Sequence, residues 1–340
     1  MSEIFKKLDE NFNHILIHSG QHYDNLLSDV FFKELKIREP NYNLKVGGPG
    51  KEHFEVTAEL STKIIKLLRE KNIKPDIILF LGDSNSVCCA VPLKKEGYTI
   101  GHIEAGMRSG DKRMLEEINR TVCDHCSDYH FVYHKNYKEN LINEGLDSEH
   151  IFVVGNTIVE VVKPIISKFD VKTESEHIIL DIHRPENFKY KNRLQNIITL
   201  ANDFRDKYNL PVKMLKFPRT TQMIQEFSID LKNIEVIDLL PYTDYLRALW
   251  KSKCLISDSG TAQEEPAFLS VPVVVPRGFT ERPESITDGC SIMVDVDDIN
   301  TLSMIPWSID WVDRFKKPKT KWMGNGKTSD KIAEILKRIL

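Results

Sequence analysis

Short apolar runs alternate with amphipathic, helix-compatible stretches along the whole chain. The runs of the first half cover residues 14–18, 77–81, 99–103, 129–133 and 151–154. The pattern then restarts, with runs at residues 178–182, 212–215, 234–237, 254–256 and 271–275. Short continuous apolar runs separated by helical segments are typical of buried parallel strands in βαβ units. The pattern therefore predicts an α/β fold with two successive series of parallel strands.

Two series of strands predict two domains, joined near residues 155–170. We expect the first domain at residues 1–160 and the second at residues 161–325. An amphipathic helix within residues 326–340 follows the turn at 324–326, and we expect it to pack back on the first domain. Ligands of open α/β sheets bind beyond the carboxyl ends of the strands, so two such domains facing each other would hold a substrate in the cleft between them.

The composition is ordinary for a globular protein with two cores: 340 residues, 41% hydrophobic and 29% charged. The formal net charge is −3 and the isoelectric point is near 6.4, whereas a general nucleic-acid binder carries a strong basic excess. The sequence contains no signal-peptide pattern and no long apolar span. We expect a cytoplasmic enzyme without a nucleic-acid or membrane partner.

Six cysteines stand mostly in apolar or helical contexts, at positions 88, 89, 123, 126, 254 and 290. They predict reduced thiols. Cys123 and Cys126 have the spacing of half a metal site, but no second Cys/His pair has zinc-ribbon spacing. The interpretation that we favour is core packing on a helix, and we predict no metal.

A candidate phosphate site follows the apolar run at 254–256. Ser259 and Gly260 are expected where a strand ends and a helix begins, and the first N–H groups of a helix favour an anion. Glu265, deeper in that helix, would repel phosphate and suits the two hydroxyls of a ribose. Arg282 lies in a nearby rigid loop, where a forked guanidinium suits a diphosphate. For Ser259 taken alone, the alternative is an ordinary helix cap.

Carboxylates follow two neighbouring predicted strands of the first half. Asp83 follows the run at 77–81, Glu104 follows the run at 99–103, and Glu116 and Glu117 come a short loop later. Acids buried side by side raise the proton affinity of at least one of them, which suits acid/base chemistry. For Asp83 alone a helix cap or turn is an equal alternative. For Glu117 we favour the structural alternative, an exposed or salt-bridged helix position.

Further polar residues stand after strands that would face the same cleft. His183 and Arg184 open the first loop of the second domain, and a histidine at a strand end beside an arginine is a candidate for acid/base chemistry. Gln21 and His22 follow the first apolar run, either as turn residues or as cleft lining. Arg219 adds a positive group after another strand, with a surface salt bridge as the alternative.

Taken together, these segments resemble the non-hydrolysing UDP-N-acetylglucosamine 2-epimerase family, which has two Rossmann-like domains in the glycosyltransferase-B architecture. The resemblance covers nearly the whole chain. It is carried by Gly20-Gln21-His22, Gly82-Asp83, Glu104-Ala105-Gly106, Glu116-Glu117-Ile118-Asn119-Arg120, Gly155-Asn156-Thr157, His183-Arg184, Asp258-Ser259-Gly260 and Thr280-Glu281-Arg282-Pro283-Glu284.

The resemblance implies an interconversion of UDP-GlcNAc and UDP-ManNAc, without a redox cofactor. UDP is eliminated to give a 2-acetamidoglucal and is added back after protonation of C2 on the other face. Elimination is also the chemically reasonable route, because the C2 proton of a sugar is very weakly acidic without an adjacent ketone. The reaction needs a base at C2, stabilisation of the leaving diphosphate and exclusion of water.

Residue roles follow from the same resemblance. Asp83, Glu104 and Glu116 match the acid/base carboxylates, and His183 matches the active-site histidine. The implied substrate- or UDP-binding residues are Gln21, His22, Arg120, Arg184, Arg219, Ser259, Gly260, Glu265 and Arg282. Among these, Ser259 and Gly260 would hold phosphate, Glu265 the ribose and Arg282 the nucleotide. A homodimer through first-domain helices and a place in polysaccharide biosynthesis are implied as well.

The chain departs from the family pattern at three places. Members open with a strand and a Gly-Thr-Arg-Pro-Glu loop, whereas residues 1–5 resemble the middle of the helix that follows this loop. A strand absent from the sheet would expose apolar surface and unpaired backbone. Phe217 stands where many relatives have a histidine. Residues 46–51 lack the Arg-Gln pattern of allosteric UDP-GlcNAc binding, so we do not predict that regulation.

Other functions remain open at this stage. Residues 82–86 and 258–261 are also similar to the branch that acts on UDP-2-acetamido-2,6-dideoxy-hexoses. A hydrolysing relative would release free ManNAc and UDP, and a nucleotide-sugar-binding protein would show no turnover. A glycosyltransferase would share the architecture but would not need three carboxylates in one half of the cleft.

Overall fold

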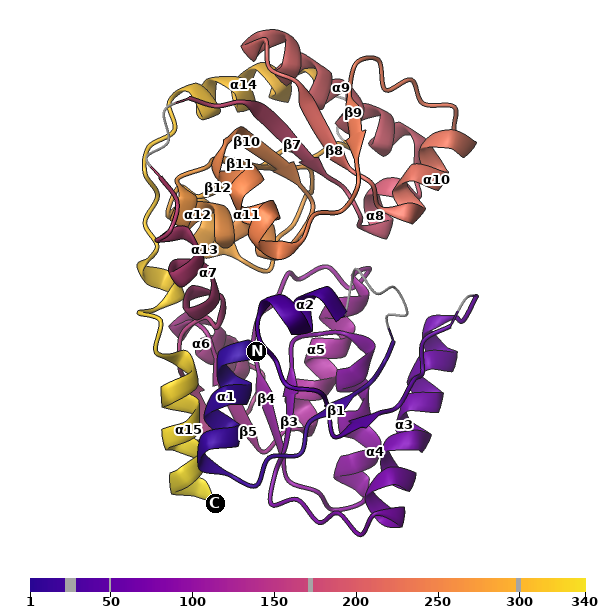
Figure 1. The fold of residues 1–340 in the computed structure, drawn as a ribbon, viewed down its shortest axis with the longest axis vertical. Helices are drawn as coiled ribbons and strands as arrows, with labels where there is room; N and C mark the ends of the chain where they lie inside the picture. Colours follow the sequence, from indigo (N-terminus) through magenta and orange to yellow (C-terminus); the bar gives the residue numbers. More distant parts are fainter. Residues whose placement is uncertain (22–28, 49, 171–173, 298–300) are drawn as a thin grey trace. The chain divides into compact units, whose positions relative to one another are not determined.

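The computed structural model describes residues 1–21, 29–48, 50–170, 174–297 and 301–340, and the chain divides into two compact units (Figure 1). Unit 1 comprises Met1–Val161 and Met323–Leu340, and unit 2 comprises Val162–Trp322. Each unit is an α/β structure with parallel strands. The α/β class with parallel sheets that the sequence predicts is confirmed.

Unit 1 contains two parallel sheets. Strands β3 (Ile78–Leu81), β4 (Ile100–Ile103), β5 (Tyr129–Val132) and β6 (Ile151–Val153) form a four-stranded sheet in sequence order, and β1 (Ile17–His18) pairs with β2 (Tyr42–Asn43). Strand β3 ends the four-stranded sheet, and all of its residues are half-buried. The helices are α1 (Ser2–Asn11), α2 (Asp29–Glu34), α3 (His53–Glu70), η2 (Asn85–Cys89), α4 (Ala90–Lys95), α5 (Leu115–Cys126), α6 (Lys135–Asn143), η3 (Ser148–His150) and α15 (Thr328–Ile339).

Unit 2 is built around one six-stranded parallel sheet in the order β12-β11-β10-β7-β8-β9. The strands are β7 (His177–Asp181), β8 (Val212–Leu215), β9 (Glu235–Ile237), β10 (Ser252–Ser257), β11 (Val273–Val275) and β12 (Ser291–Met293). The helices are α8 (Pro185–Phe188), α9 (Lys191–Tyr208), α10 (Pro218–Glu226), α11 (Tyr242–Trp250), η4 (Thr261–Gln263), α12 (Glu265–Leu269), α13 (Pro283–Thr287) and α14 (Thr301–Asp313). Helix α7 (Ile158–Ile166) and the turn η5 (Lys321–Met323) cross the boundary between the units.

The strand order of unit 2 is that of a doubly wound nucleotide-binding sheet. In chain order within the unit it corresponds to 6-5-4-1-2-3, so the direction of winding reverses between β7 and β10. A crevice forms outside the carboxyl ends of the strands at such a reversal, because the helices that follow the two strands cover opposite faces of the sheet. The loops after Asp181 and Ser257 flank this point.

The last helix of the chain packs against the first helix in unit 1 (Figure 1). Ile332 and Leu336 of α15 share one hydrophobic cluster with Ile4 and Leu8 of α1. Burial of each such side chain contributes about 1.5–3 kcal/mol, so this helix pair stabilises unit 1 although its two halves lie at opposite ends of the sequence.

The apolar runs located every strand of the sheets except two short ones. Strand β2 (Tyr42–Asn43) and strand β12 (Ser291–Met293) were not among the predicted runs. Three helices of unit 2, α8, α10 and α13, begin with proline, which has no N–H to leave unpaired and already has a helical φ. Within the described ranges, no helix is both long and apolar enough to span a bilayer.

Candidate functional site

Two of the predicted carboxylates converge on one buried arginine in unit 1. Asp83 follows β3 and Glu104 follows β4, so parallel pairing brings both to the same edge of the sheet. Arg120 on α5 pairs with the Asp83 carboxylate, and its Nη2 lies 3.2 Å from Glu104 Oε1. The Asp83 and Glu104 side chains keep 26% and 17% of their surface exposed, whereas that of Arg120 keeps none. The cation lowers the repulsion between two acids that solvent can reach.

This burial changes the interpretation of Arg120. The resemblance places it with the substrate-binding residues, and in the structure its guanidinium has no exposed surface and pairs with two protein carboxylates. We therefore assign it to orienting Asp83 and Glu104. Asn119, the preceding residue of α5, adds to this by donating to the backbone carbonyl of Asp83 at 2.9 Å.

Glu104 has an unusual backbone. Its φ is 71°, in the left-handed region that side chains other than glycine rarely adopt. Such a conformation costs of the order of 1–3 kcal/mol and is concentrated at functional sites. Tyr133 Oη donates to Glu104 Oε2 at 3.3 Å and lies 2.8 Å from Thr157 Oγ1. Sequence reasoning did not single out Tyr133, although a polar tip at the end of an apolar strand was a usable signal.

The two glutamates that open α5 differ. Glu116 is half-buried in the first turn of the helix. Glu117 is 7% exposed and accepts hydrogen bonds from Ser109 N (2.8 Å), Ser109 Oγ (3.0 Å) and Gly110 N (3.0 Å). The expectation of an exposed or salt-bridged Glu117 was therefore wrong. Its role is nevertheless structural, because its carboxylate accepts hydrogen bonds from the backbone N–H groups of the loop at residues 109–110.

Gln21 approaches the same loop region as Asp83. It is half-buried, and its Nε2 lies 3.4 Å from Ser86 Oγ in η2, three residues after Asp83. A Cβ on Gly47 would come within 2.5 Å of the Gln21 carbonyl, so this glycine permits the close approach of the two chain segments. His22 lies outside the described residues.

In unit 2 His183 stands at the point where the strand order reverses. It follows β7, and the loop after β10 holds its backbone: Asp258 Oδ1 accepts from His183 N at 3.0 Å, and Oδ2 accepts from Arg184 N at 3.1 Å. Its Nδ1 lies 2.9 Å from Asp181 Oδ1. Phe217, the residue before α10, lies against the imidazole with ring centroids 4.8 Å apart.

The charge of His183 is set by these neighbours. Burial alone would lower its pKa, but the carboxylates of Asp181 and Asp258 outweigh burial and raise the pKa to about 9. The imidazole is thus protonated at neutral pH while 31% of the side-chain surface is exposed. A positively charged, partly accessible ring is suited to stabilising or protonating an anionic group.

The same three side chains bring potential metal ligands within 4.8 Å of one another. Both Asp181 oxygens are already engaged, one by His183 and one by Ser257 Oγ at 3.0 Å. Asp258 accepts two backbone N–H groups and Asn187 Nδ2 at 2.9 Å. This arrangement suits a hydrogen-bonded imidazolium better than a bound metal ion. In the cysteine pair considered from the sequence, Cys123 is fully buried in an apolar cluster of unit 1.

The segment predicted to hold phosphate forms a turn rather than the start of one helix. After β10 the chain forms the 3₁₀ turn η4, and α12 begins separately at Glu265. The expectation of a single helix was wrong, because Pro266 has no N–H with which to continue the hydrogen-bond ladder from η4. Ser259 is half-buried, and its N–H donates to Ser257 Oγ at 3.0 Å.

Gly260 allows Arg282 to lie directly beside this turn. A Cβ at Gly260 would stand 2.5 Å from Arg282 Nη1 and 2.8 Å from Glu281 Oε1. Arg282 is 4% exposed and pairs with Glu264 at 2.5 Å and Glu281 at 2.7 Å. The two acids hold the guanidinium in place, so it contributes a fixed positive charge next to the turn.

Glu265 differs from the other acids of unit 2. Burial raises the pKa of its carboxyl to about 7, although Tyr242 Oη donates a hydrogen bond to it at 2.6 Å, which by itself would lower the pKa. The carboxyl therefore changes charge near neutral pH. A hydroxyl donor such as a ribose would favour its ionised form.

The remaining predicted arginines occupy different environments. Arg184 is mostly buried, and its Nη2 lies 3.9 Å from Glu281 Oε1. Arg219 is exposed in the first turn of α10. Arg277, which sequence reasoning did not select, is fully buried and lies 3.6 Å from Glu281 and 3.7 Å from Glu186. Glu281 thus lies among three arginines, of which Arg277 and Arg282 are its neighbours in sequence and Arg184 comes from a distant segment.

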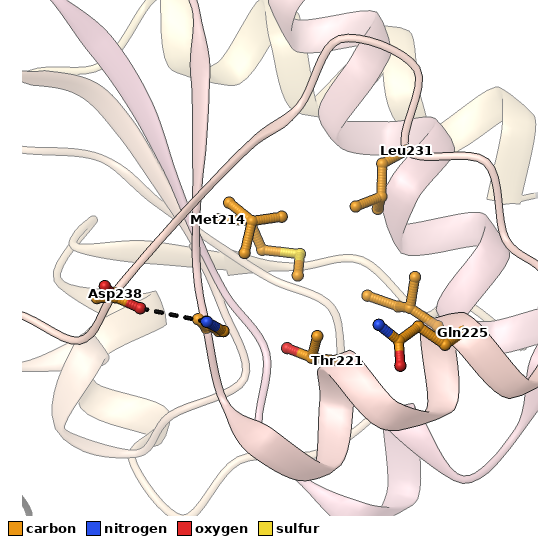
Figure 2. Close-up of a pocket in the computed structure, with 8 residues that line it drawn as sticks. Met214, Thr221, Gln225, Leu231 and Asp238 are labelled. Carbon is orange, nitrogen blue, oxygen red and sulfur yellow. Dashed lines mark hydrogen bonds and ion pairs between the residues drawn. The ribbon is translucent and has the colours of Figure 1, made fainter.

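A separate pocket of about 430 Å³ lies in unit 2 between β8, β9 and α10 (Figure 2). Lys216 and Asp238 form an ion pair, 3.5 Å apart, in its lining, and Met214 and Leu231 are among its apolar residues. The lining residues are Met214, Lys216, Thr221, Ile224, Gln225, Leu231, Val236 and Asp238. None of the residues predicted for the site lines this pocket.

Comparison with known proteins gives a consistent assignment. A family model described as UDP-N-acetylglucosamine 2-epimerase matches residues 6–337. A UDP-N-acetylglucosamine 2-epimerase of Methanocaldococcus jannaschii is 32% identical, over 99% of this chain and 94% of that protein. A UDP-2,3-diacetamido-2,3-dideoxy-D-glucuronate 2-epimerase of Pseudomonas aeruginosa is 31% identical, over 97% and 93%. The crystal structure of M. jannaschii UDP-GlcNAc 2-epimerase in complex with UDP-GlcNAc and UDP superposes with a TM-score of 0.88 at 33% identity, covering 99% and 95%.

Proposed function

Since the chain belongs to the UDP-N-acetylglucosamine 2-epimerase family, we propose that it is an isomerase that interconverts UDP-GlcNAc and UDP-ManNAc without hydrolysis. The observation that carries this proposal is the likeness, over nearly the full length of both chains, to a solved relative that binds UDP-GlcNAc and UDP. The alternatives from the sequence, a UDP-2-acetamido-2,6-dideoxy-hexose epimerase and a binding protein without turnover, have less support.

The proposed reaction is an elimination followed by an addition. A carboxylate removes the proton from C2 while the bond from C1 to the diphosphate oxygen breaks, so that UDP leaves with the electron pair and 2-acetamidoglucal remains. Protonation of C2 from the opposite face and return of UDP to C1 then give the epimer. Atoms and charge balance without a redox cofactor, because the base gains the proton that an acid later returns.

Unit 1 would supply the proton transfer in this scheme. We assign acid/base roles to Asp83, Glu104 and Glu116, with Arg120 orienting the first two. Two acids that share one cation are held close together without full repulsion, and both keep some accessible surface. Tyr133 would orient Glu104 through its hydroxyl.

Unit 2 would hold the nucleotide. We assign the diphosphate to Ser259, Gly260 and Arg282, and the ribose to Glu265. His183, positively charged near neutral pH, would stabilise the departing phosphate or donate a proton to it. We assign a further polar contact to Gln21 and Arg184. His22 and Arg219 stay predictions from the resemblance.

A test is incubation of the protein with UDP-GlcNAc in deuterium oxide, followed by NMR and mass spectrometry. Epimerisation predicts deuterium at C2 of both epimers. Free ManNAc would indicate a hydrolase instead, and a melting shift with UDP but no exchange would indicate a binding protein. The same assay with UDP-2,3-diacetamido-2,3-dideoxy-D-glucuronate tests the substrate of the P. aeruginosa relative.

Variants test the assignment of the acids. Asp83→Asn, Glu104→Gln and Glu116→Gln are each expected to lower the exchange rate about 10²-fold or more. Glu70→Gln, at the exposed end of α3, is the matched control and should exchange at the wild-type rate. Unchanged exchange in the three site variants would show that the base lies elsewhere.

We also propose that the protein is a cytoplasmic homodimer that acts in polysaccharide biosynthesis, as the resemblance implies. Light scattering coupled to size-exclusion chromatography tests the dimer, and a mass of one chain, 39.3 kDa, would contradict it.

A further inference from the structure

A buried histidine interrupts the apolar strand β4. His102 has no exposed surface and stands between the buried Gly101 and Ile103. Its Nδ1 lies 2.6 Å from Asp124 Oδ1 on α5, and its Nε2 lies 2.7 Å from the carbonyl oxygen of Gly82. A carbonyl oxygen and an ionised carboxylate can only accept, so both ring nitrogens must carry a proton. The geometry therefore requires an imidazolium that bridges the two acceptors.

The surroundings of the ring agree with this charge. Burial alone would lower the pKa of His102, but Cys123 and Asp124 outweigh burial and raise it well above its ordinary value. Asp124 is likewise fully buried: burial alone would raise its pKa, but His102 and Arg108 lower it to about 2. Two further groups face the pair: His130 on β5, whose Nε2 lies 2.7 Å from the Asp124 carbonyl oxygen, and Arg108, whose Nη1 lies 2.8 Å from Asp124 Oδ2.

The partners of this pair belong to the two loops that carry the candidate acids. Gly82, whose carbonyl binds His102, directly precedes Asp83. Gly106, whose N–H donates to Asp124 Oδ2 at 3.1 Å, lies two residues after Glu104. One hydrogen-bonded pair thus joins the loop after β3 to the loop after β4.

Helix α5 contacts these loops at two levels. Arg120 binds the carboxylates of Asp83 and Glu104, and Asp124, one turn later on the same face, binds the backbone beneath them through His102 and Gly106. The spacing of four residues on a rigid helix therefore couples the position of the acids to the position of their loops.

We propose that His102 and Asp124 form a positioning pair that sets the distance between Asp83 and Glu104 in the proposed epimerase reaction. The expected effect on the reaction rate rests on the proposed function. The geometry of the pair is independent of that function and involves residues of unit 1 only. The φ of 71° at Glu104, a conformation that residues other than glycine rarely adopt, shows that the loop after β4 holds a backbone conformation that needs support from its surroundings. A displacement of about 1 Å in a reacting group can cost about 10²-fold in rate.

His102→Gln and Asp124→Asn test the pair. Glutamine at position 102 cannot donate in opposite directions to Gly82 and to Asp124, and asparagine at position 124 removes the carboxylate that holds the imidazolium, so we expect kcat to fall about 10²-fold in each variant. The dissociation constant for UDP and the KM are expected to stay within about threefold of the wild-type values, because the pair lies in unit 1 and UDP is proposed to bind to residues of unit 2. The double variant should be no slower than the worse single variant, because both substitutions break one device.

The pH profile separates a positioning role from a merely structural one. In Asp124→Asn the imidazole loses its carboxylate, so the pKa of His102 falls and its charge is lost as pH rises. Activity of this variant is expected to recover partly toward low pH, where the ring regains its second proton and can donate from Nδ1 to the side-chain oxygen of residue 124 as well as from Nε2 to Gly82. A loss of kcat that is independent of pH would contradict the proposal.

The matched control is His177→Gln in unit 2. His177 is also a buried histidine on a strand, and its Nε2 lies 2.8 Å from the Ala248 carbonyl, but it holds no loop of the candidate acids. It should keep its kcat. If His177→Gln and His102→Gln lost equal kcat, the effect would be general destabilisation and the proposal would fail.

Hydrogen–deuterium exchange keeps this test separate from that of the reaction. In His102→Gln, segments 81–84 and 103–107 are expected to exchange faster, while the strands of unit 2 keep their protection. If the wild-type protein shows no epimerisation, and these segments exchange faster in His102→Gln, the proposed function fails and the positioning pair stands. If the protein epimerises and neither the segments nor kcat respond, the pair is refuted. If either variant does not fold, the test is an NMR spectrum of the wild-type protein. The pair predicts a low-field resonance from the imidazolium N–H of His102, and absence of this resonance would refute the pair.

Discussion

Replacing Asp181 by asparagine should lower the pKa of His183. The substitution keeps the size of the side chain and removes one of the two negative charges beside the imidazole, whose Nδ1 lies 2.9 Å from Asp181 Oδ1 and 3.6 Å from Asp258 Oδ1. Two unit charges at this separation of 2.9 Å interact by about 6 kcal/mol at an effective dielectric constant of about 20. This value is an upper bound here.

Two features reduce the expected effect. The His183 side chain is 31% exposed, so solvent screens part of the interaction, and Asp258 stays in place. We therefore expect the pKa to fall from about 9 in the wild type by about one to two units in Asp181→Asn, where one unit corresponds to about 1.4 kcal/mol.

The sign of the stability effect follows from the raised pKa. The folded state binds the His183 proton more tightly than the unfolded chain, so its contribution to the free energy of unfolding is complete below the ordinary histidine pKa of about 6.5. It is lost as pH rises through about 9. In Asp181→Asn the loss should occur at lower pH and be smaller.

The assay is an NMR titration of the histidine ring protons, with His183→Gln to assign the resonance. Asp206→Asn is the control, because it removes one negative charge from α9 of the same unit and its side chain is 66% exposed. It should leave the His183 titration unchanged. A His183 pKa in Asp181→Asn within about half a unit of the wild-type value would refute the argument that Asp181 holds the charge.

Three further predictions concern the cradle and the loops. Gly260→Ala places a Cβ 2.5 Å from Arg282 Nη1, and calorimetry should show UDP affinity at least about tenfold weaker, equal to about 1.4 kcal/mol. Gly278→Ala meets only the flexible end of an exposed aspartate and should bind normally, and equal binding by both variants would argue against the cradle. Because the pKa of Glu265 is about 7, UDP affinity should rise up to about tenfold between about pH 6 and 8; if Glu265→Gln showed the same rise, another group would be responsible. Glu117→Gln weakens hydrogen bonds to the loop at residues 109–110, so urea unfolding should show a loss of about 2–3 kcal/mol, and a loss under about 0.5 kcal/mol would show that the loop is supported otherwise.

The sequence alone determined the elements and their chemistry to a large extent. Apolar runs located the long strands because a parallel strand buried on both faces must be continuously apolar, and Asp83, Glu104 and His183 were found because they directly follow such runs. Strands β2 and β12 were missed; β1 is as short as β2 but lies within a longer apolar run, whereas asparagines flank Tyr42 of β2. The break between η4 and α12 was missed although Pro266 was visible in the sequence.

Only the tertiary structure decided which polar groups meet. The order of strands in unit 2 puts the ends of β7 and β10 side by side, and only then does Asp258 hold the backbone of His183, 75 residues away in sequence. Arg120 likewise becomes a buried partner of two acids because α5 lies across the ends of β3 and β4. Hydrophobic periodicity is a local property that records burial, whereas the charge of a buried group depends on partners that strand order and helix packing bring from distant parts of the chain.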